Sequence, residues 1–316
     1  MRRFLRARAL AISAVVSSGL PAKTAARLSS WIALGYWPRL HRPRSFNEKI
    51  LHRKFFDRDP RMPDLIDKVR AKEFVATRLG SDWIIPTYFA GRTLPPREER
   101  DWPLPFVIKP NHLSGHVIFV RRPEDVDWHS IENETETWMR IPPHGVKYSE
   151  WGYAQIEPQI LVEQYVGREE TAPLDYKFYG FRGHVEYLHV ETDRESVPKA
   201  VFYNTRWEQL PSRFRYDSTR DRIARPSTLQ EMVSAAELLS ADWPFVRVDL
   251  YEFEGRPKFG ELTFYPGAGL DPFSPREFDF ILGESWDLPR HGPLPSRGKN
   301  DAGQRVEADG EGIRPH

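Results

Sequence analysis

The sequence predicts an α+β fold in which a helical segment precedes a strand-rich region. Residues 65–75 place apolar side chains at helical spacing before Gly80 ends the run. Later in the chain, the apolar runs at residues 176–181 and 185–190 are separated by a short turn, which is typical of an antiparallel hairpin. Helices gathered in one part of a chain and strands in another are the pattern of α+β folds.

The composition excludes several classes of protein. Lys and Arg number 46 against 45 Asp and Glu, so no overall positive field attracts nucleic acid. The chain has no cysteine, which excludes disulfides and thiolate metal sites and fits a cytoplasmic protein. A length of 316 residues is enough for one large domain or for two or three smaller ones.

The N-terminus is basic and then apolar. Four arginines among the first eight residues precede the short apolar run at residues 9–16. This arrangement also fits a signal peptide, although the run is short and rich in alanine, and it is far shorter than a bilayer span. We expect a basic helix that lies on protein or makes peripheral contact with an anionic membrane surface, at the inner membrane face.

The predicted elements follow in order. Residues 1–80 form the helical N-terminal segment, in which Ser45 and Glu48 have the spacing of a helix capping box. Residues 81–289 form the main domain. It begins with a strand-rich stretch and contains a helix at 131–139, a loop at 142–153, the hairpin, and a helix opened by Pro226. Residues 290–316 carry Gly, Pro and charge with almost no apolar residues, and this composition predicts a disordered tail.

Lys109 ends an apolar strand and precedes a loop of small residues that includes Ser114 and Gly115. A cation at a strand end can bind phosphates, and small residues let backbone N–H groups approach the phosphate oxygens. The spacing matches neither a Walker loop nor a dinucleotide fingerprint. The same residues also fit a simple hairpin with an exposed lysine.

An apolar strand at residues 160–162 continues into Glu163, Gln164, Tyr165 and Val166. Such a segment can offer backbone groups to an adenine edge while apolar side chains enclose the ring. Glu169 or Glu170 can then accept hydrogen bonds from a ribose. A buried strand that ends at an exposed acid is the alternative interpretation.

Asp249 and Glu261 each lie inside an apolar strand, where a carboxylate is costly to bury unless it is paired or bound to a metal. Mg²⁺ prefers such hard oxygen ligands, so the pair is a candidate magnesium site. A structural ion pair between Asp249 and Arg247 is the alternative. Lys177 shares a strand face with Asp175, and Arg194 follows the next strand. Both cations can converge on a phosphate, or lie on a solvated sheet face.

Together these segments resemble the TupA-like family of the ATP-grasp superfamily, which is linked to teichuronopeptide and other cell-surface polymer synthesis. The resemblance covers most of residues 45–283. It is carried by the following motifs: FNEKI (46–50), DK (67–68), FVIKPNH (106–112), SG (114–115), DYKF (175–178), DR (193–194), RVDLY (247–251) and FGELTF (259–264).

The resemblance implies an ATP-grasp fold, with two α+β subdomains that grip ATP and a hinge near residues 163–166. It implies an ATP- and Mg²⁺-dependent ligase that joins a carboxylate to an amine through an acyl phosphate. The implied roles are phosphate binding by Lys109, a covering loop with Ser114 and Gly115, catalytic cations at Lys177 and Arg194, and Mg²⁺ ligands at Asp249 and Glu261. Many ATP-grasp enzymes carry Asn where this chain has Thr263, which puts a second metal in doubt.

The sequence leaves two other classes of function open. A glycosyltransferase of a polysaccharide biosynthesis cluster needs a DxD-type metal motif. Residues 57–59 match that motif in letters, but they lie among helical residues. A nucleotide-binding protein without catalysis is the second alternative. The sequence does not identify the substrates, which we expect to be a small-molecule or glycan carboxylate and an amine of the cell envelope.

Overall fold

The computed structural model describes residues 2–167, 172–192, 199–214 and 223–288. Its N-terminal helices are α1 (Arg2–Val16), α2 (Ala22–Leu34), α3 (Phe46–Phe56), α4 (Met62–Ile66) and α5 (Arg70–Leu79). The predicted capping box is confirmed, because the Ser45 hydroxyl accepts the Glu48 N–H while the Glu48 carboxylate accepts the Ser45 N–H. None of the described helices has the length and apolar character needed to cross a bilayer.

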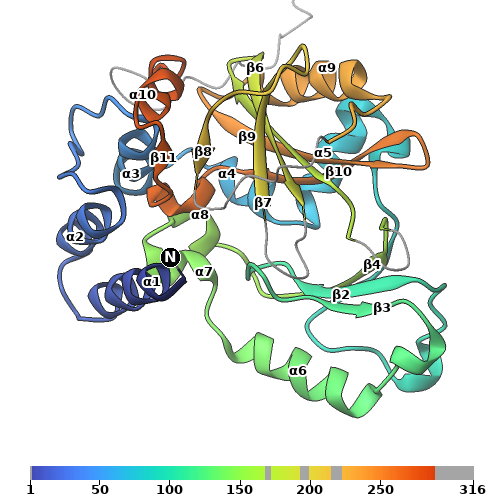
Figure 1. Cartoon of the computed structure of the whole chain (residues 1–316). Helices are drawn as coiled ribbons and strands as arrows, with labels where there is room; N and C mark the ends of the chain where they lie inside the picture. Colours follow the sequence, from blue (N-terminus) through green and yellow to red (C-terminus); the bar gives the residue numbers. More distant parts are fainter. Residues whose placement is uncertain (1, 168–171, 193–198, 215–222, 289–316) are drawn as a thin grey trace, which may run out of the picture.

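A four-stranded antiparallel sheet follows, in the order β1-β4-β2-β3. Its strands are β1 (Thr87–Gly91), β2 (Phe106–Pro110), β3 (Ile118–Val120) and β4 (Ile160–Gln164). Helix α6 (Trp128–Arg140) covers this sheet and confirms the helix predicted at residues 131–139 (Figure 1). Ile131 and Trp138 of α6 pack with Ile108 and Val162 in a small core.

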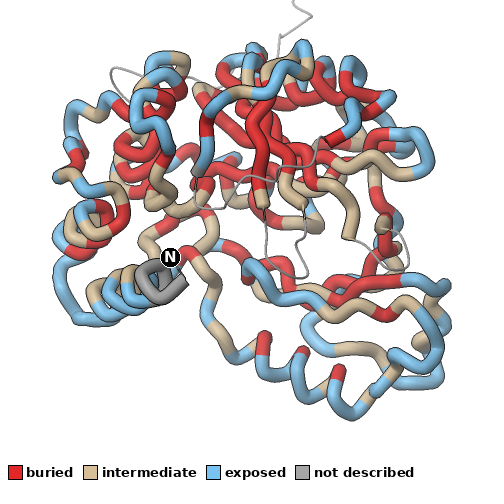
Figure 2. The backbone as a smooth tube through the Cα atoms, viewed as in Figure 1, coloured by how far each residue is buried: buried red, intermediate tan, exposed pale blue. Residues whose placement is uncertain are grey.

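The second sheet has five antiparallel strands in the order β10-β9-β5-β6-β7. They are β5 (Asp175–Phe181), β6 (His184–Thr192), β7 (Lys199–Asn204), β9 (Val246–Phe253) and β10 (Arg256–Thr263). Strands β5 and β6 form the predicted hairpin, and α9 (Leu229–Ser240) is the helix predicted after Pro226. Figure 1 shows α9 against this sheet, and Figure 2 shows most of the sheet's strands buried.

The larger core joins the five-stranded sheet to the N-terminal helices. Phe46, Ile50, Ala71 and Val75 pack in the same cluster as the apolar residues of β5, β6 and β9. Short strands β8 (Arg213–Phe214) and β11 (Phe273–Ser274) pair beside α10 (Glu277–Glu284), which contacts α3. The helical segment is therefore packed as part of one body with the larger sheet.

The prediction of a loop at residues 142–153 is wrong in part, because this segment contains α7 (His144–Tyr148) and most of α8 (Trp151–Ala154). Both helices are very short and depend on close packing. A Cβ on Gly145 would lie 2.3 Å from the Glu150 carbonyl oxygen, and one on Gly152 would lie 2.5 Å from Ile66. The tail predicted at 290–316 lies outside the described residues, and the domain bounds proposed from the sequence stay a prediction.

Candidate active site

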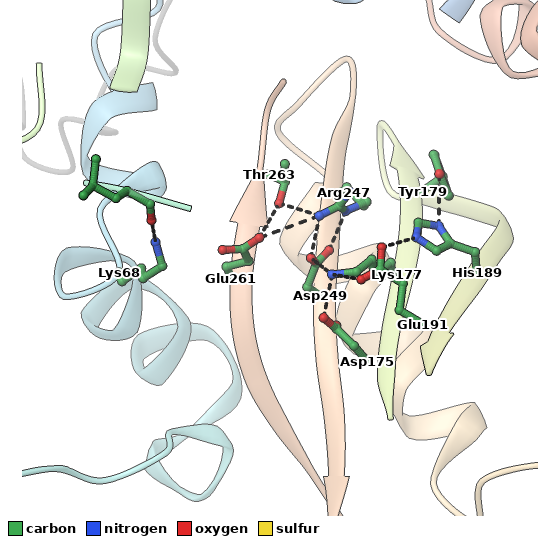
Figure 3. A network of polar contacts seen from close by, with 11 residues as sticks. Lys68, Asp175, Lys177, Tyr179, His189, Glu191, Arg247, Asp249, Glu261 and Thr263 are labelled. Carbon is green, nitrogen blue, oxygen red and sulfur yellow. Dashed lines mark hydrogen bonds and ion pairs between the residues drawn. The ribbon is translucent and has the colours of Figure 1, made fainter. Parts of the chain in front are cut away.

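A row of polar side chains crosses the five-stranded sheet from β10 to β6. Glu261 pairs in register with Asp249, Asp249 with Lys177, and Lys177 with His189. Residues paired in this way point to the same face of a sheet, and Figure 3 shows these side chains together. The two carboxylates proposed from the sequence thus lie on neighbouring strands, β9 and β10.

A β-bulge at Gly260 brings Glu261 into this row. Phe259 pairs with Leu250 and Glu261 with Asp249, so two residues of β10 advance against one residue of β9. Without the extra residue, Glu261 would point to the opposite face, because side chains alternate along a strand. A Cβ on residue 260 would lie 2.9 Å from the Asp249 carbonyl oxygen, so the close approach of the strands requires glycine.

Asp249 is 1% exposed and has two cationic partners. Arg247 donates through Nε to Oδ1 (2.7 Å) and through Nη2 to Oδ2 (2.6 Å), while Lys177 Nζ donates to Oδ2 (2.6 Å). Burial alone would lower the pKa of Lys177, but the carboxylates of Asp175 and Asp249 outweigh it and raise the pKa well above its ordinary value. The ion pair between Arg247 and Asp249, the alternative interpretation of the sequence, is thus present.

Glu261 is more open, with 34% of its side chain exposed. Thr263 donates its hydroxyl to Glu261 Oε1 (3.0 Å) and accepts a hydrogen bond from Arg247 Nη2 (3.1 Å). Thr263 therefore links Arg247 to the acid instead of providing an amide ligand. Among the described residues, no group of three or more His, Cys, Asp or Glu side chains is arranged to hold a metal. Two carboxylates, one of them open to solvent, fit the usual way of binding Mg²⁺ with substrate phosphates.

Lys109 and Glu163 lie in the four-stranded sheet and form an ion pair. Glu163 is 2% exposed, and Lys72 Nζ of α5 lies 2.6 Å from its Oε1. Burial would raise the pKa of Glu163, but the two ammonium groups outweigh it and hold the pKa below its ordinary value. Burial would lower the pKa of Lys109, but Glu163 and Tyr251 raise it.

Lys68 and Lys72 are site residues that sequence reasoning missed. Lys68 Nζ donates to the carbonyl oxygens of Asn111 (3.1 Å) and Leu113 (3.4 Å), at the start of the small-residue loop. Burial lowers the pKa of Lys68, and the nearby Glu261 opposes this effect. The sequence contained one signal, the DK motif at 67–68, but nothing in it assigned the lysine a role.

The predicted covering loop is exposed at Ser114 and Gly115. Gly115 has φ +76°, and a Cβ on it would meet no atom within 4 Å. The predicted hinge leaves β4, where the N–H groups of Gln164 and Tyr165 donate to the carbonyls of Pro86 and Pro105, each at 3.0 Å. Val166 is buried. Three predicted residues, Glu169, Glu170 and Arg194, lie outside the residues that the structure describes.

The two larger antiparallel sheets, each with its own core, together with the lysines and paired carboxylates that they carry, agree with the α+β ATP-grasp fold expected from the sequence. The sequence profile of one family, described as TupA-like ATPgrasp, matches residues 48–287. The chain belongs to the TupA-like ATP-grasp family.

Comparison with solved structures gives distant similarities. An L-amino acid ligase from Bacillus licheniformis is 14% identical, with a TM-score of 0.41 over 65% of this chain and 44% of that chain. A D-alanine–D-alanine ligase from Bacillus anthracis is 17% identical, with a TM-score of 0.39 over 65% and 57%. The chain spans about half the length of these two proteins. A search of curated proteins gave no match.

Proposed function

We propose that the chain is an ATP- and Mg²⁺-dependent ligase that joins a carboxylate to an amine through an acyl phosphate. The observation that carries the proposal is the row of Glu261, Asp249 and Lys177 on one face of the larger sheet. Membership of the ATP-grasp superfamily supports it. Phosphoryl transfer needs positioned cations and little covalent chemistry from the protein, and this site offers such cations.

Lys109 of the smaller sheet and Lys72 of α5 are the proposed phosphate-binding cations. Glu163 holds both ammonium groups in place, so they are already positioned when the phosphates arrive. Ser114 and Gly115 form the proposed covering loop, and residues 163–166 the proposed adenine hinge. Lys68 connects this loop to the helical segment through Asn111 and Leu113.

Asp249 and Glu261 are the proposed Mg²⁺ ligands. The metal, when bound, neutralises charge on the transferred phosphoryl group. Lys177 stays protonated next to Asp249, so it can stabilise the anionic oxygens of the acyl phosphate that the amine then attacks. Arg194 is the second proposed cation.

We propose a substrate of the cell envelope, a small-molecule or glycan carboxylate used in polysaccharide or peptidyl-glycan biosynthesis. The same proposal places the protein in the cytoplasm, at the inner membrane face. The basic helix α1 supports this location, since it begins with arginines and exposes 71% of Leu10. Cosedimentation with anionic and with neutral vesicles tests the membrane contact. Equal recovery with both would contradict it.

ADP release tests the ligase reaction. The protein is supplied with ATP and Mg²⁺ and with pairs of candidate acids, including uronic acids and amino acids, and amines. We expect ADP and phosphate only when both an acid and an amine are present, and none with Glu261→Gln. Transfer from a UDP-sugar without ATP would replace the proposal with a glycosyltransferase. ATP binding without turnover for any pair would favour a protein that only binds nucleotide.

A further inference from the structure

A concave site lies outside both large sheets, between the segment that follows α2 and helix α10. The cavity encloses about 360 Å³. Its lining combines aromatic and charged side chains: Tyr36, Trp37, Arg39, Arg44, Glu48, Arg276 and Phe280. None of these residues belongs to the candidate active site, so the inference that follows does not rest on the proposed ligase reaction.

Two acids near this cavity, Glu48 and Asp279, are already engaged by the protein. Glu48 accepts the backbone N–H groups of Arg39 (2.8 Å) and Arg44 (2.7 Å), which fixes the shape of the segment between them. Asp279 accepts the Tyr36 hydroxyl (3.0 Å) and the Asn47 N–H (2.9 Å). Each carboxylate therefore accepts hydrogen bonds from backbone N–H groups or from a hydroxyl, and neither forms an ion pair with a guanidinium of the cavity.

Among the described residues, no carboxylate pairs with the three guanidinium groups of the cavity. Arg39, Arg44 and Arg276 are exposed, and in the part of the chain that the structure describes their side chains form no hydrogen bond or ion pair. Arg276 instead stacks on aromatic rings, with its guanidinium carbon 4.4 Å from the Tyr36 ring centroid and 5.8 Å from that of Phe280. Stacking of this kind fixes the plane of the guanidinium while its N–H groups stay available.

Aromatic rings provide the other half of the site. Trp37 exposes 55% of its surface, although a large aromatic ring of this kind is normally buried. Tyr36 and Phe280 are half-buried, so they are held in place while part of each ring faces the cavity. Rigid aromatic faces combined with a few positioned polar groups are the usual lining of a site for a small organic ligand.

We propose that this cavity binds an acidic sugar, with its carboxylate on the arginines and its ring against Trp37. Guanidinium groups recognise carboxylates through paired N–H donors, which accounts for the arginines. A bare phosphate would use the arginines but not the aromatic faces. A neutral sugar would use the aromatic faces but leave three positive charges uncompensated. An acidic sugar uses both features.

Calorimetric titration of the full chain tests this proposal with three probes: a galacturonate trimer, a neutral glucose trimer and inorganic phosphate. We expect the galacturonate trimer to bind and the other two to bind at least about tenfold more weakly. Arg276→Ala and Arg39→Ala should each weaken binding of the acidic trimer by about tenfold, since each removes a paired donor. Trp37→Ala should weaken it as well.

Arg42→Ala is the matched control, because Arg42 is an exposed arginine of the same segment and does not line the cavity. It should bind the acidic trimer as the unchanged protein does. Melting temperatures of all the variants should agree, since the changed side chains are exposed. Equal affinity for phosphate and the acidic trimer, or equal loss in Arg42→Ala and Arg276→Ala, would overturn the proposal. Binding only to anionic lipid vesicles, with no response to the trimer, would also overturn it.

Discussion

Lys109 on β2 and Glu163 on β4 form an ion pair diagonally across two neighbouring strands. Glu163 is in register with Val107, and Lys109 with Leu161, so the two charged side chains are on the same face of the sheet. Lys72 reaches the same carboxylate from α5. One buried acid thus holds two lysines that we propose for phosphate binding, and its replacement has measurable consequences.

We expect Glu163→Gln to lower the free energy of unfolding by about 3–5 kcal/mol, because it leaves two ammonium groups without their buried partner. ATP should raise the melting temperature of this variant more than that of the unchanged protein, since phosphates then supply the missing negative charge. Urea unfolding and thermal melts with and without ATP measure both effects. Glu136→Gln, at an exposed pair with Arg140, is the control and should change neither.

The two proposed metal ligands should respond differently to substitution. Glu261→Gln should abolish Mg²⁺-dependent ADP release and leave the melting temperature unchanged or slightly raised, because Glu261 is partly exposed. Asp249→Asn should lower the free energy of unfolding by about 3–5 kcal/mol, because it leaves Arg247 and Lys177 without their buried acid. A large loss of stability in Glu261→Gln, with metal dependence intact, would contradict the assignment.

Removal of Lys72 should weaken ATP binding although the residue lies in the helical segment. Lys72→Ala should raise the dissociation constant for ATP by about tenfold, through loss of one cation near the phosphates. Lys72→Arg should keep most of the affinity, because the charge is retained. Nucleotide titration measures this. Lys147→Ala, at an exposed lysine, is the control, and an equal loss in the control would contradict the role of Lys72.

Glu150 should contribute a loss of stability as the pH rises from about 4.5 to about 7. Burial raises the pKa of this acid to about 7, and its nearest cation is Lys54, 4.0 Å away. The pKa of Glu150 is higher in the folded protein than its ordinary value of 4.5. Proton binding by Glu150 therefore stabilises the folded state fully below about pH 4.5, and this stabilisation is lost as the pH rises through about 7. The free energy of unfolding at about pH 8, relative to its value at about pH 5, should be higher in Glu150→Gln than in the unchanged protein, and urea unfolding at both pH values measures this.

The bulge at Gly260 gives a prediction about geometry. Gly260→Ala should lower the free energy of unfolding by about 1–3 kcal/mol, because its Cβ must displace the Asp249 backbone or Tyr251. It should also weaken Mg²⁺-dependent turnover, since Glu261 is held by the same bulge. Lys258→Ala, on the same strand before the bulge, should leave turnover unchanged. Normal turnover in Gly260→Ala would show that the bulge does not position Glu261.

Local signals in the sequence predicted much of the fold. The Ser45 and Glu48 box, the β5–β6 hairpin and the start of α9 each depend on residues that are close in sequence. The acid pair was found because a carboxylate inside an apolar strand is conspicuous. The resemblance to the family then gave these separate segments a common fold and a role in it.

The remaining features depend on contacts between distant parts of the chain. The bulge decides the face of Glu261, but its position is set by pairing with β9 and not by the residues of β10 alone. Lys72 meets Glu163 because α5, which packs in the larger core, brings this one side chain to the smaller sheet. The short helices α7 and α8 have weak local propensity and form against neighbours such as Ile66.

The lysines of the helical segment connect two separately packed bodies. Ala71 and Val75, beside Lys68 and Lys72, are packed in the larger core, whereas Ile108 and Val162, beside Lys109 and Glu163, are packed in the smaller one. The Lys72–Glu163 and Lys68–Asn111 contacts therefore cross the joint between the two bodies. A rocking of one sheet away from the other must stretch these polar contacts before it disturbs either apolar interior. Charged side chains thus contribute to the stiffness of that joint, and a competing anion that draws Lys72 from Glu163 loosens it.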